Sequence, residues 1–216
     1  MSYEKRIFKN LSLIGNFNNE RVRLGNIYRL DDGDFMLMGH VSDFDSTIDI
    51  DAITEKSNPI NRDMKSGSDV KVATHGNSTQ PVAKEEIEVV VGSARSGVVM
   101  LKDCVTSTIK LHVIKQKLLA VWEAQEFDKK PRRYCIVSEM LHPASGTVLI
   151  TESRNTRVVL KAKGPVPVGG VPTMMEGDVS VTVQTDRINH IISPQSFQPL
   201  WKGVRFKRNG EFETIG

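Results

Sequence analysis

Residues 92–97, Gly-Ser-Ala-Arg-Ser-Gly, have the glycine spacing of a phosphate-binding loop. In such a loop the second glycine is followed by a lysine and a hydroxyl residue, which contact the phosphates and the magnesium ion. In this chain Val98 and Val99 occupy those two positions. We therefore expect a hairpin turn at 92–96 that joins two strands and has no nucleotide chemistry.

Four carboxylates, Asp43, Asp45, Asp49 and Asp51, offer the oxygen ligands that calcium prefers. A calcium-binding loop that began at Asp43 would need a glycine at its sixth position and an acidic residue at its twelfth. The sequence has neither. A solvated acidic loop is the simpler expectation.

The five histidines and two cysteines form no metal-binding or catalytic pattern. No histidine has a His or Cys partner two to five residues away, which is the spacing that zinc sites use. Cys104 or Cys135 could be a nucleophile with a distant histidine, but neither lies in a catalytic signature, and lone cysteines are more often buried. No acid and base pair stands out. We predict no catalytic residue, no metal and no cofactor.

The composition is that of one globular domain. The chain has 216 residues, 39% of them hydrophobic and 25% charged, which is enough to form a core without disulfides. Two cysteines suit a reducing compartment, so we expect a cytoplasmic protein. The longest apolar run, 118–122, is five residues, whereas a spanning helix needs about 20.

Charge is distributed unevenly along the chain. Residues 1–30 carry six Lys or Arg against two acidic residues, and residues 31–56 carry eight acidic residues against one lysine. Such a separation can steer a protein toward phosphates or anionic lipid headgroups, although solvated charge without function is commoner. With 6% aromatic residues and no alternation of aromatic and basic positions, we expect no nucleic-acid partner.

The elements that must position these residues predict an α+β fold. Residues 27–41 have the pattern of a hairpin around Asp31-Asp32-Gly33-Asp34, and residues 57–86 are predicted to be a long polar loop. Helical spacing of apolar residues predicts one amphipathic helix at 114–127. The expected strands are 87–91, 97–102, 106–113, 133–141, 146–151, 156–163, 178–185, 187–192 and 201–208.

Apolar residues alternate with polar ones along two of these strands. Val179, Val181 and Val183 recur at every second position, as do Val158 and Leu160. Alternation of this kind predicts a sheet with one dry face and one wet face. The short connections predict antiparallel pairing, so we expect a single domain over 1–216 with a twisted, mostly antiparallel sheet.

The second half of the chain resembles the bacterial gasdermins, a family of pore-forming cell-death proteins. The resemblance runs over 134–212: YCIVSEMLHPASGTVLI, then RVVLKAKGPVPVGG, then an alternating valine strand. The closing segment is Pro-Leu-Trp-Lys-Gly-Val-Arg at 199–205, before an Asn-Gly turn at 209–210. The first half is similar to the family more weakly, through the Leu-Asp-Asp-Gly hairpin and the polar loop that follows it.

This resemblance implies a cytoplasmic monomer that, once activated, moves to the cell membrane, inserts β-hairpins and assembles into a homo-oligomeric pore, in cell death or antiviral defence. A protease or a protein partner is the implied activator, and the two hairpins are expected at 87–113 and 146–185. The apolar residues implied to insert are Val89, Val91, Val99, Leu101, Leu149, Val158, Leu160, Val179, Val181 and Val183. The basic residues implied to meet anionic headgroups are Lys5, Arg6, Lys9, Lys129, Lys130, Arg132 and Arg133.

Two alternatives from other classes stay open. The first is a soluble, β-rich binding or adaptor domain that recognises a protein partner and never enters lipid. The second is an enzyme whose site has no recognisable signature.

Overall fold

A computed structural model describes most of the chain. The described residues are 14–15, 22–31, 34–66, 70–75, 86–91, 96–129, 133–151, 156–161, 180–183, 188–193, 200–207 and 210–215. Their strands are antiparallel and their helices are few, so the predicted α+β class, with a mostly antiparallel sheet, is confirmed.

The chain forms two compact units, each built from separate stretches of sequence. Unit 1 comprises residues 1–58, 105–142 and 198–216, and unit 2 comprises residues 59–104 and 143–197. Strand β8 (Ser96–Ile109) contributes to both, because residue 104 is the last of its residues in unit 2 and residue 105 is the first in unit 1.

Unit 1 is a sheet with a helix packed on it. The long helix α3 (Lys115–Ala124) buries Leu118, Val121 and Trp122 in one core cluster with sheet residues such as Ile136 and Phe206. The predicted helix at 114–127 is therefore confirmed apart from its ends. The other elements of unit 1 are β1 (Ile14–Gly15), β2 (Asn26–Asp31), β3 (Asp34–His40), α2 (Val41–Phe44), η1 (Asp51–Ile53), β4 (Thr54–Lys56), η2 (Phe127–Lys129), β9 (Tyr134–His142), β14 (Leu200–Phe206) and β15 (Phe212–Ile215).

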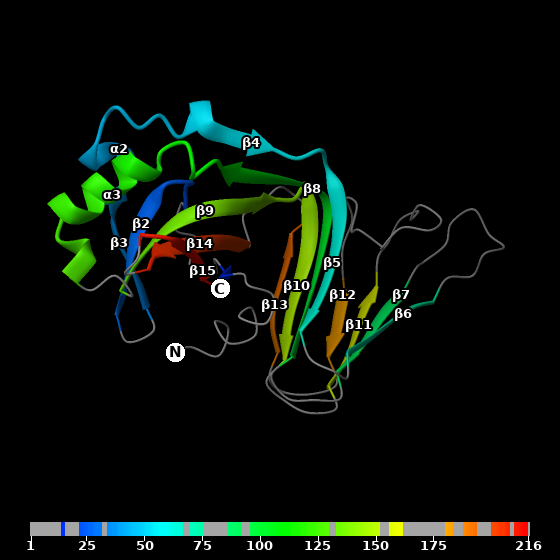
Figure 1. The fold of residues 1–216 in the computed structure, drawn as a ribbon. Coiled ribbons are helices and arrows are strands. Elements are labelled where there is room, and N and C mark those ends of the chain that lie inside the picture. Colours follow the sequence, from blue (N-terminus) through cyan, green and yellow to red (C-terminus); the bar gives the residue numbers. More distant parts are fainter. Residues whose placement is uncertain are drawn as a thin grey trace. The chain divides into compact units, whose positions relative to one another are not determined.

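Unit 2 contains two sets of four strands. Figure 1 shows them as two groups of arrows. In the first set β8 lies between its neighbours in the order β5-β8-β10-β13, and the second set has the order β6-β7-β11-β12. The bounds are β5 (Ile60–Ser66), β10 (Ser145–Thr151), β13 (Ile188–Ser193), β6 (Val70–His75), β7 (Glu86–Val91), β11 (Thr156–Lys161) and β12 (Ser180–Val183).

The two sets repeat one another strand by strand. Each strand of the first set is next along the chain to the strand that holds the same place in the second set: β5 with β6, β8 with β7, β10 with β11, and β13 with β12. The chain thus passes between the sets four times. It does so at residues 67–69, 92–95, 152–155 and 184–187, which lie outside the described residues.

Two sequence predictions are wrong, and both errors involve strand pairing. The long loop predicted at 57–86 contains β5 and β6, which pair with β8 and β7. The turn predicted at 92–96 does not join a hairpin, because β7 pairs with β6 and β11 while β8 pairs with β5 and β10. Backbone pairing with distant apolar strands, rather than local hydrophobicity, makes 60–66 and 70–75 extended.

Other predicted elements agree with the structure. The hairpin at 27–41 is β2 paired with β3. The strand predicted at 106–113 is the end of β8 and stops at Ile109. Among the described residues no helix is both long and apolar enough to cross a membrane.

One titratable group gives the stability of unit 1 a pH dependence. Burial, and then the charge of Lys56, lowers the pKa of His142 below its ordinary value of 6.5. The folded chain therefore binds a proton here less readily than the unfolded chain, so this group lowers the free energy of unfolding as the pH falls through about 6.5. Urea unfolding at about pH 7.5 and 5.5 should show a larger loss for the native chain than for His142→Gln. Equal losses would assign the pH dependence to other groups.

Candidate functional site

The inner strands of the two sets keep one register. Ser96 of β8 pairs with Thr151 of β10, and Val91 of β7 pairs with Thr156 of β11. Both strands therefore advance five residues between the sets, from 96 to 91 and from 151 to 156. The outer pairs advance unequally. On the side of β5 and β6, one chain segment advances four residues between the sets, from Ser66 to Val70. Its partner segment advances six residues, from Gly97 to Val91.

Pairing groups the eight strands into two long hairpins. The first joins residues 60–75 to residues 86–104, and the second joins residues 145–161 to residues 180–193. These bounds replace the predicted hairpins at 87–113 and 146–185. The first prediction missed the partner strand at 60–75, and the second ended before β13.

One face of the β6-β7-β11-β12 sheet is apolar in register. Strand residues that pair share a face, and the faces alternate along each strand. A row of four valines, one from each strand, crosses the sheet, and the neighbouring row has Thr, Ile, Leu and Val. The two rows are Val72, Val89, Val158 and Val183, then Thr74, Ile87, Leu160 and Val181.

The opposite face of the same sheet is polar and charged. Ala73, Glu88, Val159 and Thr182 form one of its rows, and the next has a polar or charged residue in each strand. That next row is His75, Glu86, Lys161 and Ser180. The sheet is therefore amphipathic across all four strands.

The structure brings six of the predicted inserting residues onto this one apolar face. Val179, a seventh, lies outside the described residues. The six are Val89, Val91, Val158, Leu160, Val181 and Val183.

The other three predicted residues lie in the β5-β8-β10-β13 sheet. Val99 and Leu101 are each 1% exposed, and their neighbours Val98 and Met100 are buried as well, so both faces of β8 are covered here. Leu149 pairs with Val98, which places it on the face opposite Val99. These three residues do not share a single outward apolar face.

Unit 1 carries an exposed apolar surface that sequence reasoning missed. Met36, Leu37 and Met38 on β3 are 48%, 56% and 38% exposed. Along the described residues β3 pairs with β2 alone, so it is an edge strand. The hairpin is anchored by Tyr28 and by Phe35, which is next to the turn, because both rings pack on the indole of Trp201. The sequence did contain a signal for this exposure. Three large apolar residues follow one another in the hairpin, where apolar and polar residues were expected to alternate.

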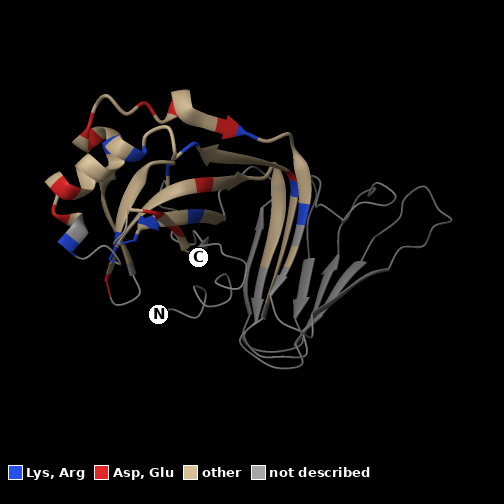
Figure 2. Ribbon diagram, in the orientation of Figure 1, with Lys and Arg blue, Asp and Glu red and all other residues tan. Residues whose placement is uncertain are grey.

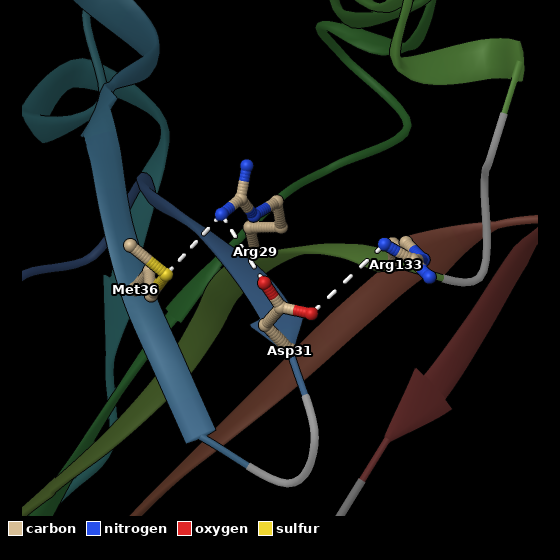
Figure 3. A network of polar contacts seen from close by, with 4 residues as sticks. All are labelled: Arg29, Asp31, Met36 and Arg133. Atoms are coloured by element: carbon tan, nitrogen blue, oxygen red, sulfur yellow. Dashed lines mark hydrogen bonds and ion pairs between the residues drawn. The ribbon is translucent and has the colours of Figure 1, made fainter.

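Arginines flank this edge strand. Arg29 Nη2 donates to Asp31 Oδ2 and to the Met36 sulfur, each at 3.3 Å, and Arg133 Nη1 lies 3.9 Å from Asp31 Oδ1 (Figure 3). Two guanidinium groups thus share one carboxylate. Asp34, which pairs with Asp31 across the hairpin, adds a second carboxylate to this end of the strand.

The predicted basic residues are only partly described. Arg133 and Lys129 are exposed, and Lys129 pairs with Glu126 at 2.7 Å, a surface pair that stabilises little. Figure 2 shows basic and acidic residues interspersed over unit 1. The other predicted basic residues, Lys5, Arg6, Lys9, Lys130 and Arg132, lie outside the described residues.

The acidic segment uses its carboxylates within its own turns. Asp43 accepts the His40 N–H at 2.6 Å, Asp45 accepts from the backbone and hydroxyl of Thr47, and Asp49 accepts the Ala52 N–H. The hydrogen bonds from Thr47 hold the pKa of Asp45 below its usual value. Within the described ranges, no three His, Cys, Asp or Glu residues lie together as a metal site would require.

Both cysteines are buried, and neither forms a disulfide. Burial raises the pKa of Cys135 to about 12, against the partly opposing effects of a Tyr28 backbone hydrogen bond and of Arg205. Because the thiolate is the nucleophile, this environment disfavours Cys135 as a catalytic residue.

Thiol labelling tests that reading. In the folded protein at about pH 8, iodoacetamide should leave Cys135 and Cys104 unmodified, since neither sulfur is accessible and Cys135 is protonated. Both should react within minutes in guanidinium chloride. Rapid labelling of Cys135 in the native state would restore it as a candidate nucleophile.

No protein-family model matches the chain, and no curated protein matches it. The resemblance to the bacterial gasdermins therefore stays a prediction.

Proposed function

We propose that this chain is a pore-forming protein, similar in action to the bacterial gasdermins, whose two long hairpins enter the membrane. The observation that supports it best is the repeated strand order of the two sets in unit 2, with the inner pair in continuous register. On insertion each strand of the first set joins the strand next to it along the chain, for example β5 with β6, to form one long strand. The resting protein is cytoplasmic in this proposal, and the active one lies at the cell membrane.

The hairpins have the dimensions that insertion requires. A tilted strand crosses the hydrocarbon core with about 9–11 residues, and lipid-facing residues alternate with lumen-facing ones. The stretches 60–75, 86–104, 145–161 and 180–193 each exceed that length. The valine rows would face lipid, and the rows that carry Glu88 and Lys161 would face water.

Assembly follows from the edges of the same sheets. Strands β6 and β12 stand at the two ends of their set, so among the described strands each has one partner. An unpaired edge pairs readily with another copy, and pairing around a closed ring leaves no backbone group unsatisfied in lipid. A homo-oligomeric pore is therefore the expected active form, after release by a protease or a protein partner.

The β3 edge gives the protein a way to reach the membrane first. Three exposed apolar side chains near Arg29 and Arg133 suit the interface, where apolar groups enter and basic groups meet anionic headgroups. Each Lys or Arg near such a surface contributes about 1 kcal/mol.

Adjacent valines on opposite faces provide the test of insertion. Val158 lies on the apolar face and Val159 on the charged face, so Val158→Asp should abolish dye release from phosphatidylglycerol-rich liposomes while Val159→Asp largely retains it. A charge on the lipid-facing side of a membrane strand costs up to about 2–4 kcal/mol near the midplane, and less for Asp than for Lys or Arg.

Val89 and Val90 form a second pair with the same expectation in the other hairpin. Negative-stain images should show rings for Val90→Asp and none for Val89→Asp. Equal leakage from both members of a pair would refute the assignment of that face. The absence of leakage and of lipid binding by the folded native chain, with any activating partner supplied, would refute pore formation.

A soluble adaptor domain is the second candidate, favoured by the same β3 edge. Exposed edge strands can accept an added strand from a partner protein. The triple change Met36→Ser, Leu37→Ser and Met38→Ser separates the two functions, because each truncated side chain removes on the order of 1 kcal/mol of apolar contact.

For a membrane protein this variant should bind vesicles at least about tenfold more weakly while its thermal midpoint is unchanged. Unaltered vesicle binding would remove the β3 edge from the membrane proposal and favour a protein partner there. Val113→Ser, which changes an exposed residue away from β3, is the control.

A further inference from the structure

Strand β8 changes partners at one point along its length. On one side it pairs with β10 up to Lys102 and with β9 from Val105 on. On the other side it pairs with β5 up to Cys104 and with β4 from Ser107 on. In both ladders the neighbour before and the neighbour after are consecutive in sequence, so β8 exchanges both of its neighbours over residues 102–107.

Asp103 is strained at this point. Its φ is +45°, and the other described non-glycine residue with positive φ, Glu126, follows a helix end rather than lying in a strand. Left-handed backbone costs an L-residue roughly 1–2 kcal/mol, with Asp and Asn the most tolerant types after Gly. The β5 ladder also shifts register here: Ile60 pairs with Cys104 and Arg62 with Leu101, which leaves Asn61 opposite two residues.

Hydrogen bonds outside the regular ladders hold β8 and the segments beside it in place. The Asn61 amide oxygen accepts the Asp103 N–H at 3.0 Å. The Ala144 N–H donates to the carbonyl of Lys102, and the Thr106 N–H donates to the Ser57 hydroxyl at 2.9 Å. Pro59 and Pro143 stand in the flanking segments, where they cannot donate a backbone N–H.

We propose that Asp103, with Asn61 as its latch, is the hinge at which β8 straightens when unit 2 leaves its resting form. In the resting state the Asn61 side chain holds residue 103 in the left-handed conformation. Straightening returns residue 103 to extended backbone and releases that strain. This inference rests on the proposed function only where it states that the hinge controls insertion into membranes. The hinge itself is a property of the protein in solution.

Amide hydrogen exchange of the full chain without lipid tests the hinge directly. In Asn61→Ala the Asp103 amide loses its acceptor and exchanges faster in any case. A hinge requires more, namely that the Thr106 and Ala144 amides also exchange faster, and by the same factor, because one opening exposes all three. We expect an acceleration of about five- to thirtyfold, the factor that corresponds to a change of one to two kcal/mol. Faster exchange confined to Asp103 would overturn the proposal.

Asp103→Gly is the complementary variant. Asp103 is exposed, so the change removes strain without emptying a core, and the three amides should exchange several-fold more slowly than in the native chain. Thr108→Gly is the matched control at an exposed position of β8 with regular partners, and it should not slow them. Unchanged exchange in Asp103→Gly would also overturn the hinge.

Dye release then separates the hinge from the pore. If both hold, Asn61→Ala releases dye faster than the native chain and Asp103→Gly more slowly. If the exchange results stand but no variant leaks, the hinge is retained and pore formation fails. If leakage occurs at equal rates in all three proteins, the hinge does not control insertion and the proposal fails in its functional part.

Discussion

Strand β8 is paired on both sides over residues 97–101 and 107–108 and on one side over most of the residues between, and this pairing constrains the strands around it. Four strands, β4, β5, β9 and β10, take their register from its backbone. A one-residue slip would move every side chain of a strand to the opposite face, so the burial of Val98 and its neighbours on both faces fixes the register strongly. Through β10 and β7 the same register continues into the second set. The amphipathic valine rows therefore exist because β8 is held, although none of them lies on β8.

The two sheets of unit 2 differ in how their apolar residues are used. In β8 four consecutive apolar residues, 98–101, are buried, which is the pattern of a strand covered on both faces. In β7 the pattern alternates, with Ile87, Val89 and Val91 on one face and two glutamates on the other. A sheet with one apolar and one charged face suits an interface between lipid and water, whereas a doubly covered strand must lose neighbours before it can enter one. For the proposed pore former, insertion is therefore expected to begin in the second set and to reach β8 later.

Local patterns predicted the elements whose stability is local. The β2–β3 hairpin and α3 were predictable because turn residues and helical spacing lie within one short window. Residues 60–75 were not, since polar residues such as Asn61, Asp63 and Lys65 hide a strand that forms only by pairing with β8. The same long-range pairing explains why the strand pairs differ from the predicted hairpins and why Val99 and Leu101 are buried. Alternation in 156–161 and 180–183 did predict a common face, because apolar residues two apart must share one wherever the strand pairs.

The strain at Asp103 is consistent with the proposed hinge. Glycine would adopt the same backbone with less strain, and aspartate is among the few other types that tolerate it. The difference is small beside a typical unfolding free energy of 5–15 kcal/mol, so it does not threaten the fold. It is large beside the balance between two arrangements of the same strands, where about 1.4 kcal/mol changes the population ratio tenfold. A left-handed aspartate held by one amide side chain can therefore bias a conformational change while the bulk of the core, buried elsewhere, keeps the resting protein folded.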